Sequence, residues 1–138
     1  MAEKKFSKKE DYRLSGKTFN VIVTHWHTDG YADVVSPEEH WCLYVVIGKD
    51  HPLYEMACDN KDDEYGYDTG DKVYDSWHGG CTFYDKQTTY VEIGCDYQHL
   101  WDEQYWSCTE MPEDIKNDAM DLYNFFEAQE KQNLTEDK

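Results

Sequence analysis

Residues 74–102 constrain the fold more than any other stretch, because they contain two β-rich runs joined by a short turn. Residues 82–85 and 89–95 are rich in Thr, Tyr, Phe, Val and Ile, which suit a pleated, half-buried surface. Glycines stand at both ends of this pair, at Gly80 and Gly94, where a bend or a close backbone approach would need them. The pattern predicts an antiparallel hairpin whose ends bring His78 close to Asp96 and His99.

Two earlier segments predict further strands. Residues 18–26 alternate Phe19, Val21 and Val23 with other residues, and this period of two is typical of a strand. Residues 41–47 form a continuous apolar run, which predicts a strand buried on both faces at the centre of the sheet.

Helical signals occur at two places. Ser36-Pro37-Glu38-Glu39 has an N-cap residue, a proline at the first helical position and acids in the first turn, so it predicts a short helix start. Pro112 predicts the start of an amphipathic helix that runs to about residue 129, because apolar residues then recur at helical spacing: Ile115, Ala119, Leu122 and Phe126. The chain is therefore expected to be α+β, with a small antiparallel sheet of about four to five strands and the amphipathic C-terminal helix packed on one face.

The length of 138 residues fits one domain. Residues 1–17 are polar and lysine-rich, and we expect a basic N-terminal arm there, either a contact arm or a frayed terminus. Residues 18–131 are expected to form a single globular domain, and residues 132–138 a frayed tail.

The charge of the chain is strongly acidic and unevenly spread. The net charge is −17; residues 1–17 hold six bases and three acids, and the remaining residues hold 7 bases and 27 acids, a net charge of −20. Such a body repels phosphate, so no direct nucleic acid binding is expected, and it is attracted to basic surfaces. Residues 59–75 are expected to form an acidic loop, which is a solvated loop, a calcium site or a surface for a basic partner.

That loop and the outer face of the last helix form the expected interaction surface: Asp59, Asp62, Asp63, Glu64, Asp68, Asp71, Asp114, Asp118 and Asp121.

The cysteines favour a reducing compartment. The chain has five of them, an odd number, with no C-x-x-C pair and no apolar N-terminal segment. Reduced thiols are the simplest interpretation, so we expect a cytoplasmic protein. No apolar run approaches the roughly 18 residues that a membrane span needs, so no membrane association is expected.

Histidines provide the candidate metal ligands. His25 and His27 alternate in an extended segment and can point the same way toward a shared metal, with Asp29 completing the set. His78, Asp96 and His99 form the second candidate set, either as ligands or as a hydrogen-bonded brace. The first set resembles the T-H-x-H-x-D-H signature of the metallo-β-lactamase superfamily, but Gly30 stands where that family has its last histidine. No cofactor is predicted.

Three segments together resemble a family of small, mostly uncharacterised phage and prophage proteins. Those proteins carry H-P-L-Y, H-G-G-L-T-[FY] and G-F-D-C-A-H-x-G-D in that order, and this chain has His51-Pro52-Leu53-Tyr54, residues 78–83 and residues 94–102 at the matching places. Cys95, Tyr97 and Trp101 depart from the family pattern. The resemblance implies one shared polar cluster of five matching residues: His51, His78, Asp96, His99 and Asp102.

The resemblance and the acidity together suggest a function. Small acidic phage proteins resemble inhibitors of host defence, including anti-CRISPR proteins, which implies a host nucleic-acid-binding partner with a basic surface, such as a CRISPR effector, in the cytoplasm of the bacterial host. Nucleic-acid mimicry is one mode of such inhibition. Two alternatives stay open: a small metal-dependent hydrolase that uses His78, Asp96 and His99, and a sponge for a signalling nucleotide. The sponge would stack a base on aromatic side chains: Trp77, Phe83, Tyr97 and Trp101.

Overall fold

The computed structural model describes residues 9–28, 38–61, 63–98 and 102–136. Five strands, three α-helices and one 3-10 turn occur in these residues, in the following order: β1 Lys9–Ser15, β2 Phe19–Thr28, β3 Glu38–Gly48, α1 Tyr54–Cys58, α2 Tyr67–Val73, β4 Phe83–Lys86, β5 Tyr90–Asp96, η1 Glu103–Tyr105 and α3 Glu113–Glu136. The strands form one antiparallel sheet in the order β1-β2-β3-β5-β4. The α+β prediction is confirmed.

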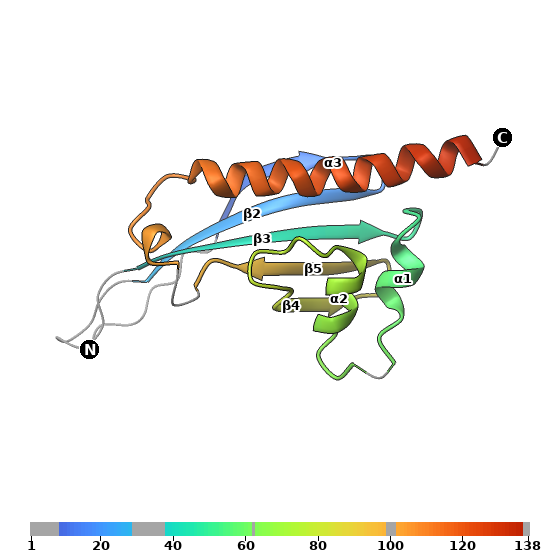
Figure 1. The fold of residues 1–138 in the computed structure, drawn as a ribbon, viewed down its shortest axis with the longest axis horizontal. Coiled ribbons are helices and arrows are strands. Elements are labelled where there is room, and N and C mark those ends of the chain that lie inside the picture. The colour runs from blue at the N-terminus through green and yellow to red at the C-terminus, as the bar shows by residue number, and fades with distance from the viewer. Residues whose placement is uncertain (1–8, 29–37, 62, 99–101, 137–138) are drawn as a thin grey trace.

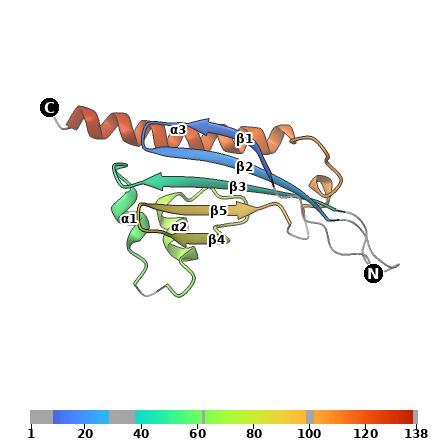
Figure 2. The same ribbon diagram turned by 180° about the vertical axis from the view of Figure 1, so that it is seen from behind.

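All three helices lie on the same side of the sheet. Figure 1 shows α3 in front of β1 and β2, and α1 and α2 in front of β5 and β4; Figure 2, from behind, shows the strands in front. α3 contacts β1, β2 and β3, whereas α1 contacts β3 and β5 and α2 contacts β4. The molecule therefore has a helical side and a sheet side.

The core lies between the sheet and the helices. Val45 of β3 pairs with Val21 of β2 on one side and with Ile93 of β5 on the other, so their side chains share one face of the sheet. All three are at most 1% exposed. α3 packs its predicted apolar stripe onto this face, and each of its members is 0% exposed: Ile115, Ala119, Leu122 and Phe126. The periodicity of the last helix is confirmed.

The hairpin is confirmed as β4 and β5, and its glycines act as predicted. Gly79 and Gly80 have φ angles of 71° and 90°, which favour glycine. A Cβ at Gly94 would lie 2.3 Å from the Tyr44 ring and 2.5 Å from the Leu43 carbonyl oxygen. Gly94 is therefore required because Tyr44 of the neighbouring strand lies against its backbone.

The N-terminal arm is wrong for residues 9–15, which form the edge strand β1. Tyr12 and Leu14 pair with Val23 and Val21, so both side chains reach the face that carries the core. The outward residues Glu10 and Arg13 form an ion pair with N–O 2.6 Å. These charges made the segment read as polar, whereas two inward side chains are enough to hold a strand on β2.

The helix start at residues 36–39 is also wrong where the structure describes it. Glu38 and Glu39 begin β3 and pair with Thr28 and His27. Ser36 and Pro37 lie outside the described residues. A local capping signal has been overridden by strand pairing, which supplies many more hydrogen bonds than one helical turn.

Two boundaries differ from the predictions. Residues 67–73 form α2, so the acidic segment is not all loop. α3 continues to Glu136 and not to about residue 129, and the Glu130 carboxylate accepts a hydrogen bond from the Thr18 backbone N–H at 2.7 Å. This contact with the β1–β2 turn holds the helix beyond its predicted end. The frayed tail predicted for residues 132–138 is wrong for residues 132–136, which belong to α3.

Candidate functional site

His78, which is partly buried, and Asp102, which is fully buried, form a pair at one end of the sheet. His78 Nε2 donates to Asp102 Oδ1 at 2.7 Å, and the Asp102 side chain is 0% exposed. The His78 ring stacks on Tyr97 with centroids 4.4 Å apart, and Tyr105 meets Tyr97 edge-on at 5.4 Å. The sequence predicted Asp96 and His99 as neighbours of His78. The structure gives Asp102 as its ion-pair partner, and His99 lies outside the described residues.

Tyr97 and Tyr105 extend this cluster to α3. The Tyr97 hydroxyl donates to Asp118 at 2.6 Å, and the Tyr105 hydroxyl donates to Asp114 at 3.3 Å. Burial raises the pKa of Asp118 above its usual value. Asp118 was predicted on the outer interaction surface; this is wrong, because its carboxylate is half-buried and bound to Tyr97.

Asp96 has a local structural role. Its Oδ1 accepts the backbone N–H of Gln98 at 3.2 Å, and its Oδ2 accepts the Thr82 hydroxyl at 3.4 Å. The first contact spans two residues and closes the turn that follows β5. The second joins the two ends of the hairpin.

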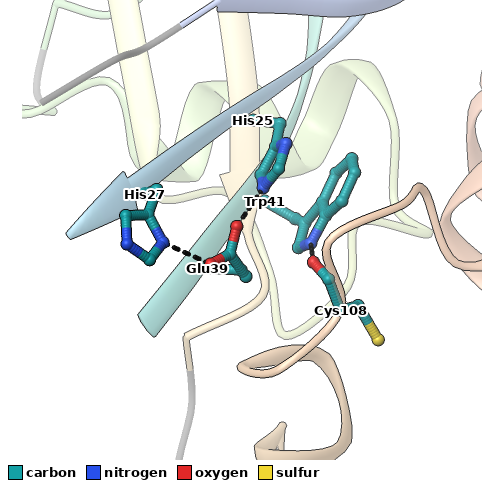
Figure 3. A network of polar contacts seen from close by, with 5 residues as sticks. All are labelled: His25, His27, Glu39, Trp41 and Cys108. Carbon is teal, nitrogen blue, oxygen red and sulfur yellow. Dashed lines mark hydrogen bonds and ion pairs between the residues drawn. The ribbon is translucent and has the colours of Figure 1, made fainter. Parts of the chain in front are cut away.

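A second histidine cluster lies where β2 ends and β3 begins. Glu39 stands between His25 and His27 and accepts from His25 Nε2 at 2.7 Å and from His27 Nδ1 (Figure 3). His25 stacks on Trp41 with centroids 4.1 Å apart, and the Trp41 indole donates to the Cys108 carbonyl at 3.1 Å. The cluster therefore ties the β2–β3 ladder to the segment that follows η1.

Glu39 is ionised despite its burial. Burial opposes the charge, but the hydrogen bonds from His27 and His25 outweigh it and hold the pKa of Glu39 below its usual value. The sequence analysis singled out both histidines and missed Glu39, because it assigned that residue to a helix start. The register His27 to Glu39 is the signal that would have found it.

Neither histidine cluster forms a metal site within the described residues. Among these residues, no group of three or more His, Cys, Asp or Glu side chains is placed to hold a metal ion. Figure 3 shows His25 and His27 on either side of the Glu39 carboxylate, each bound to its own oxygen. Asp29 and His99, which completed the two predicted ligand sets, lie outside the described residues.

His51 does not belong to the same site as His78. Gly48 pairs with Tyr90 at one end of the β3–β5 ladder and Cys42 pairs with Asp96 at the other, so His51, which follows Gly48, lies at the opposite end of the sheet from the end of β5. The shared cluster predicted for the motif residues is therefore wrong for His51.

The contacts of His51 are those of a structural histidine. Its Nε2 donates to the Phe126 carbonyl at 3.0 Å, and its Nδ1 accepts the Leu53 N–H at 3.0 Å. His51 is 3% exposed, and burial lowers its pKa. Two side-chain nitrogens thus join the end of β3, the start of α1 and α3.

The thiols and two of the aromatic rings near the hairpin are buried, which disfavours thiol catalysis and the stacking of a nucleotide base there. Burial raises the pKa of Cys81 to about 11 and raises that of Cys95 further, so both thiols stay protonated and are poor nucleophiles. Trp77 and Tyr97, two of the rings predicted to stack on a nucleotide base, are 5% and 0% exposed. Trp101 lies outside the described residues.

The predicted acidic surface divides into structural and exposed carboxylates. Asp63 accepts the backbone N–H groups of Gly66 and Thr69, both at 2.9 Å, and the Thr69 contact is the main reason why its pKa lies below the usual value. Asp71 accepts the Cys81 N–H at 2.8 Å. Asp62 lies outside the described residues. Asp71 is nevertheless exposed, and so is the rest of the predicted set: Asp59, Glu64, Asp68, Asp114 and Asp121.

A polar hollow of about 350 Å³ opens beside α2, and Asp59, Asp63 and Asp68 stand in its wall. Its lining also includes two bases, Lys61 and Lys72.

The comparisons with known proteins give no further guide to function. No family model, no curated protein and no solved structure matches the chain. Within the described part of the chain, no helix has the length and apolar character that crossing a membrane requires.

Proposed function

We propose that this protein binds a basic, nucleic-acid-directed defence protein of a bacterial host and inhibits it, as anti-CRISPR proteins do. The observation that carries the proposal is the distribution of exposed carboxylates over α1, α2 and α3. These helices lie on one side of the sheet (Figure 1), so one partner surface can meet them together.

Acids outnumber bases on this helical side. The exposed bases within residues 54–75 and 113–132 are Lys61, Lys72 and Lys131. The exposed acids in the same described residues are Glu55, Asp59, Glu64, Asp68, Asp71, Asp75, Glu113, Asp114 and Asp121.

The chemistry of this surface favours a protein partner over a nucleic acid. Carboxylates repel phosphate and are attracted to the Lys and Arg side chains that line nucleic-acid-binding channels. The resemblance to phage proteins suggests that the partner is a protein of the bacterial host. A CRISPR effector in the host cytoplasm would be such a partner. Occupation of its channel would exclude the nucleic acid.

The test is a pull-down of host nucleases at low and at high salt. Screening shortens the range of exposed charges, to about 10 Å at 0.1 M ionic strength. We expect a complex that forms at low salt and weakens as salt rises. No complex with any nuclease at low salt, where the attraction is greatest, would sink the proposal.

Two matched variants separate this surface from net charge. The first combines Asp59→Asn, Glu64→Gln and Asp68→Asn, on the helical side. The second combines Asp11→Asn, Asp50→Asn and Glu110→Gln, which are exposed and lie outside α1, α2 and α3. Both remove three negative charges, and we expect only the first to weaken the complex substantially.

The hydrolase alternative depends on His99, which lies outside the described residues, and His78 is bound to Asp102 instead of sharing a ligand set with Asp96. The nucleotide sponge loses support because Trp77 and Tyr97 are buried.

A further inference from the structure

The exposed apolar side chains are concentrated in one segment. Among the described residues, the exposed large hydrophobic side chains are Met56 at 49%, Tyr65 at 63%, Tyr67 at 40% and Met120 at 44%. Three of these four lie between the start of α1 and the start of α2. Single exposed apolar residues need no explanation, but a local group of them is typical of a protein-binding surface.

The two tyrosines form a pair. Their rings are stacked, with centroids 5.5 Å apart and planes 24° apart. Tyrosine offers a large contact area with few rotatable bonds, which is why it is enriched at the centre of protein interfaces. The two rings are not part of the hydrophobic core, so their exposed area is available to a partner.

The backbone between the two rings is firmly held. Gly66 is buried, has a φ of 79° and lies against Tyr84, whose ring would be 2.2 Å from a Cβ at this position. Asp63 accepts the N–H of Gly66 at 2.9 Å, and the Tyr84 hydroxyl donates to the Ala57 carbonyl. A loop fixed in this way loses little conformational entropy when a partner binds.

Exposed carboxylates flank the pair in the sequence. Glu64 precedes Tyr65, Asp68 follows Tyr67, and both are exposed. Asp59, Asp63 and Asp68 stand in the wall of the polar hollow beside α2. A ring face next to carboxylates fits a guanidinium group, which stacks on the ring and also forms paired hydrogen bonds with a carboxylate. An ammonium group is compact and more strongly hydrated, so it gains less from the ring.

We propose that Tyr65 and Tyr67, with Met56 and the flanking acids Asp59, Glu64 and Asp68, form a docking surface for an arginine-rich segment of a protein partner. We name this set the tyrosine surface. The inference rests on the proposed function, which requires a basic partner, and adds that the partner's contact residues are arginines that reach these two rings.

The test uses two fluorescent peptides, deca-arginine and deca-lysine, and measures their binding to the full chain by fluorescence anisotropy at low salt. We expect the wild-type protein to bind deca-arginine about fivefold more tightly than deca-lysine, since each exposed cation–π contact contributes about 0.5–1 kcal/mol. The double variant Tyr65→Ala/Tyr67→Ala should lose most of this preference and keep its affinity for deca-lysine. The control Met120→Ala removes an exposed apolar side chain on α3, and it should keep the preference.

The outcomes separate this inference from the proposed function. Equal affinities for the two peptides in the wild type, or an unchanged preference in the double variant, would overturn the tyrosine surface and leave charge-driven binding intact. No binding of either peptide at low salt would overturn the proposed function itself. Circular dichroism shows whether the double variant is folded; if it is not, Tyr65→Ser alone, at the more exposed ring, gives the same comparison.

Discussion

At the scale of single residues, His51 is held by contacts that fix its protonation. His51 donates through Nε2 to Phe126 and accepts through Nδ1 from Leu53. This pattern requires the neutral ring, because a proton on Nδ1 would break the Leu53 contact. Burial also lowers the pKa of His51, because removal from water disfavours the charged ring.

His51 should therefore make the protein less stable in mild acid. The pKa of His51 in the folded protein lies below the usual value of 6.5, so the unfolded chain takes up the proton first as the pH falls. The stabilisation that is present above the unfolded pKa is therefore lost as the pH falls through the folded pKa. Between about pH 7.5 and 5.5, the free energy of unfolding should fall faster in the wild type than in His51→Gln, by at most about 1.4 kcal/mol per pH unit. Urea unfolding across this range measures the difference, and parallel curves would contradict it.

His78 is expected to matter for stability before it matters for binding. His78→Ala removes a donor to a carboxylate that is 0% exposed and a ring stacked on Tyr97, so the free energy of unfolding should fall by about 3 kcal/mol. Urea denaturation measures the loss. A double-mutant cycle with Asp102→Asn should show a coupling between the two residues. A stable His78→Ala variant that no longer captures its partner would instead make His78 a contact residue.

At the scale of elements, Gly66 and Gly80 offer a matched comparison. Both have positive φ angles, 79° and 90°. A Cβ at Gly66 would collide with the Tyr84 ring, whereas at Gly80 its nearest neighbours are the Asp71 carboxylate oxygens at 3.8 Å. Gly66→Ala should cost about 2–4 kcal/mol from backbone strain and crowding, and Gly80→Ala about 1 kcal/mol from strain alone. Thermal or urea unfolding of the two variants checks this, and equal losses would contradict the packing of Tyr84.

The elements with strong periodicity could be predicted from the sequence, and the others could not. The alternation in residues 18–26 and the stripe from Ile115 to Phe126 each identify the buried face of their element. The continuous apolar run in residues 41–47 identifies the central strand, but it does not show that Cys42 and Val46 are only partly buried. In β1, only Tyr12 and Leu14 indicate the buried face, and the position of the strand depends on pairing with β2. The helix signal at residues 36–39 is local, and strand pairing of Glu39 overrides it.

The contacts of the candidate site were predicted less well, because they depend on how the chain continues after β5. A hairpin brings its own two ends together, so the contact between Thr82 and Asp96 follows from the sequence. The partner of His78 comes from Asp102, beyond the hairpin, and no sequence pattern fixes that distance. The hydrogen bonds that give Asp63, Asp71 and Asp118 a structural role likewise require the fold.

At the scale of the whole molecule, the protein has a helical side and a sheet side (Figures 1 and 2). The helical side carries the exposed acids of α1, α2 and α3, and it also carries the tyrosine surface. The net charge of −17 sets a long-range attraction to basic proteins, while the two rings would set which basic side chain is preferred. In the proposed complex, charge would govern the rate of encounter and its salt dependence, and the tyrosine surface would govern specificity.

The most direct test of the account is competition between this protein and duplex DNA for one partner nuclease. A fixed amount of the nuclease and labelled duplex is titrated with the protein at low salt, and the bound duplex is measured by anisotropy. We expect the wild type to displace the duplex completely and the Asp59→Asn, Glu64→Gln, Asp68→Asn variant to require a higher concentration. A stable ternary complex of nuclease, duplex and protein would contradict the claim that the helical side occupies a nucleic-acid-binding surface.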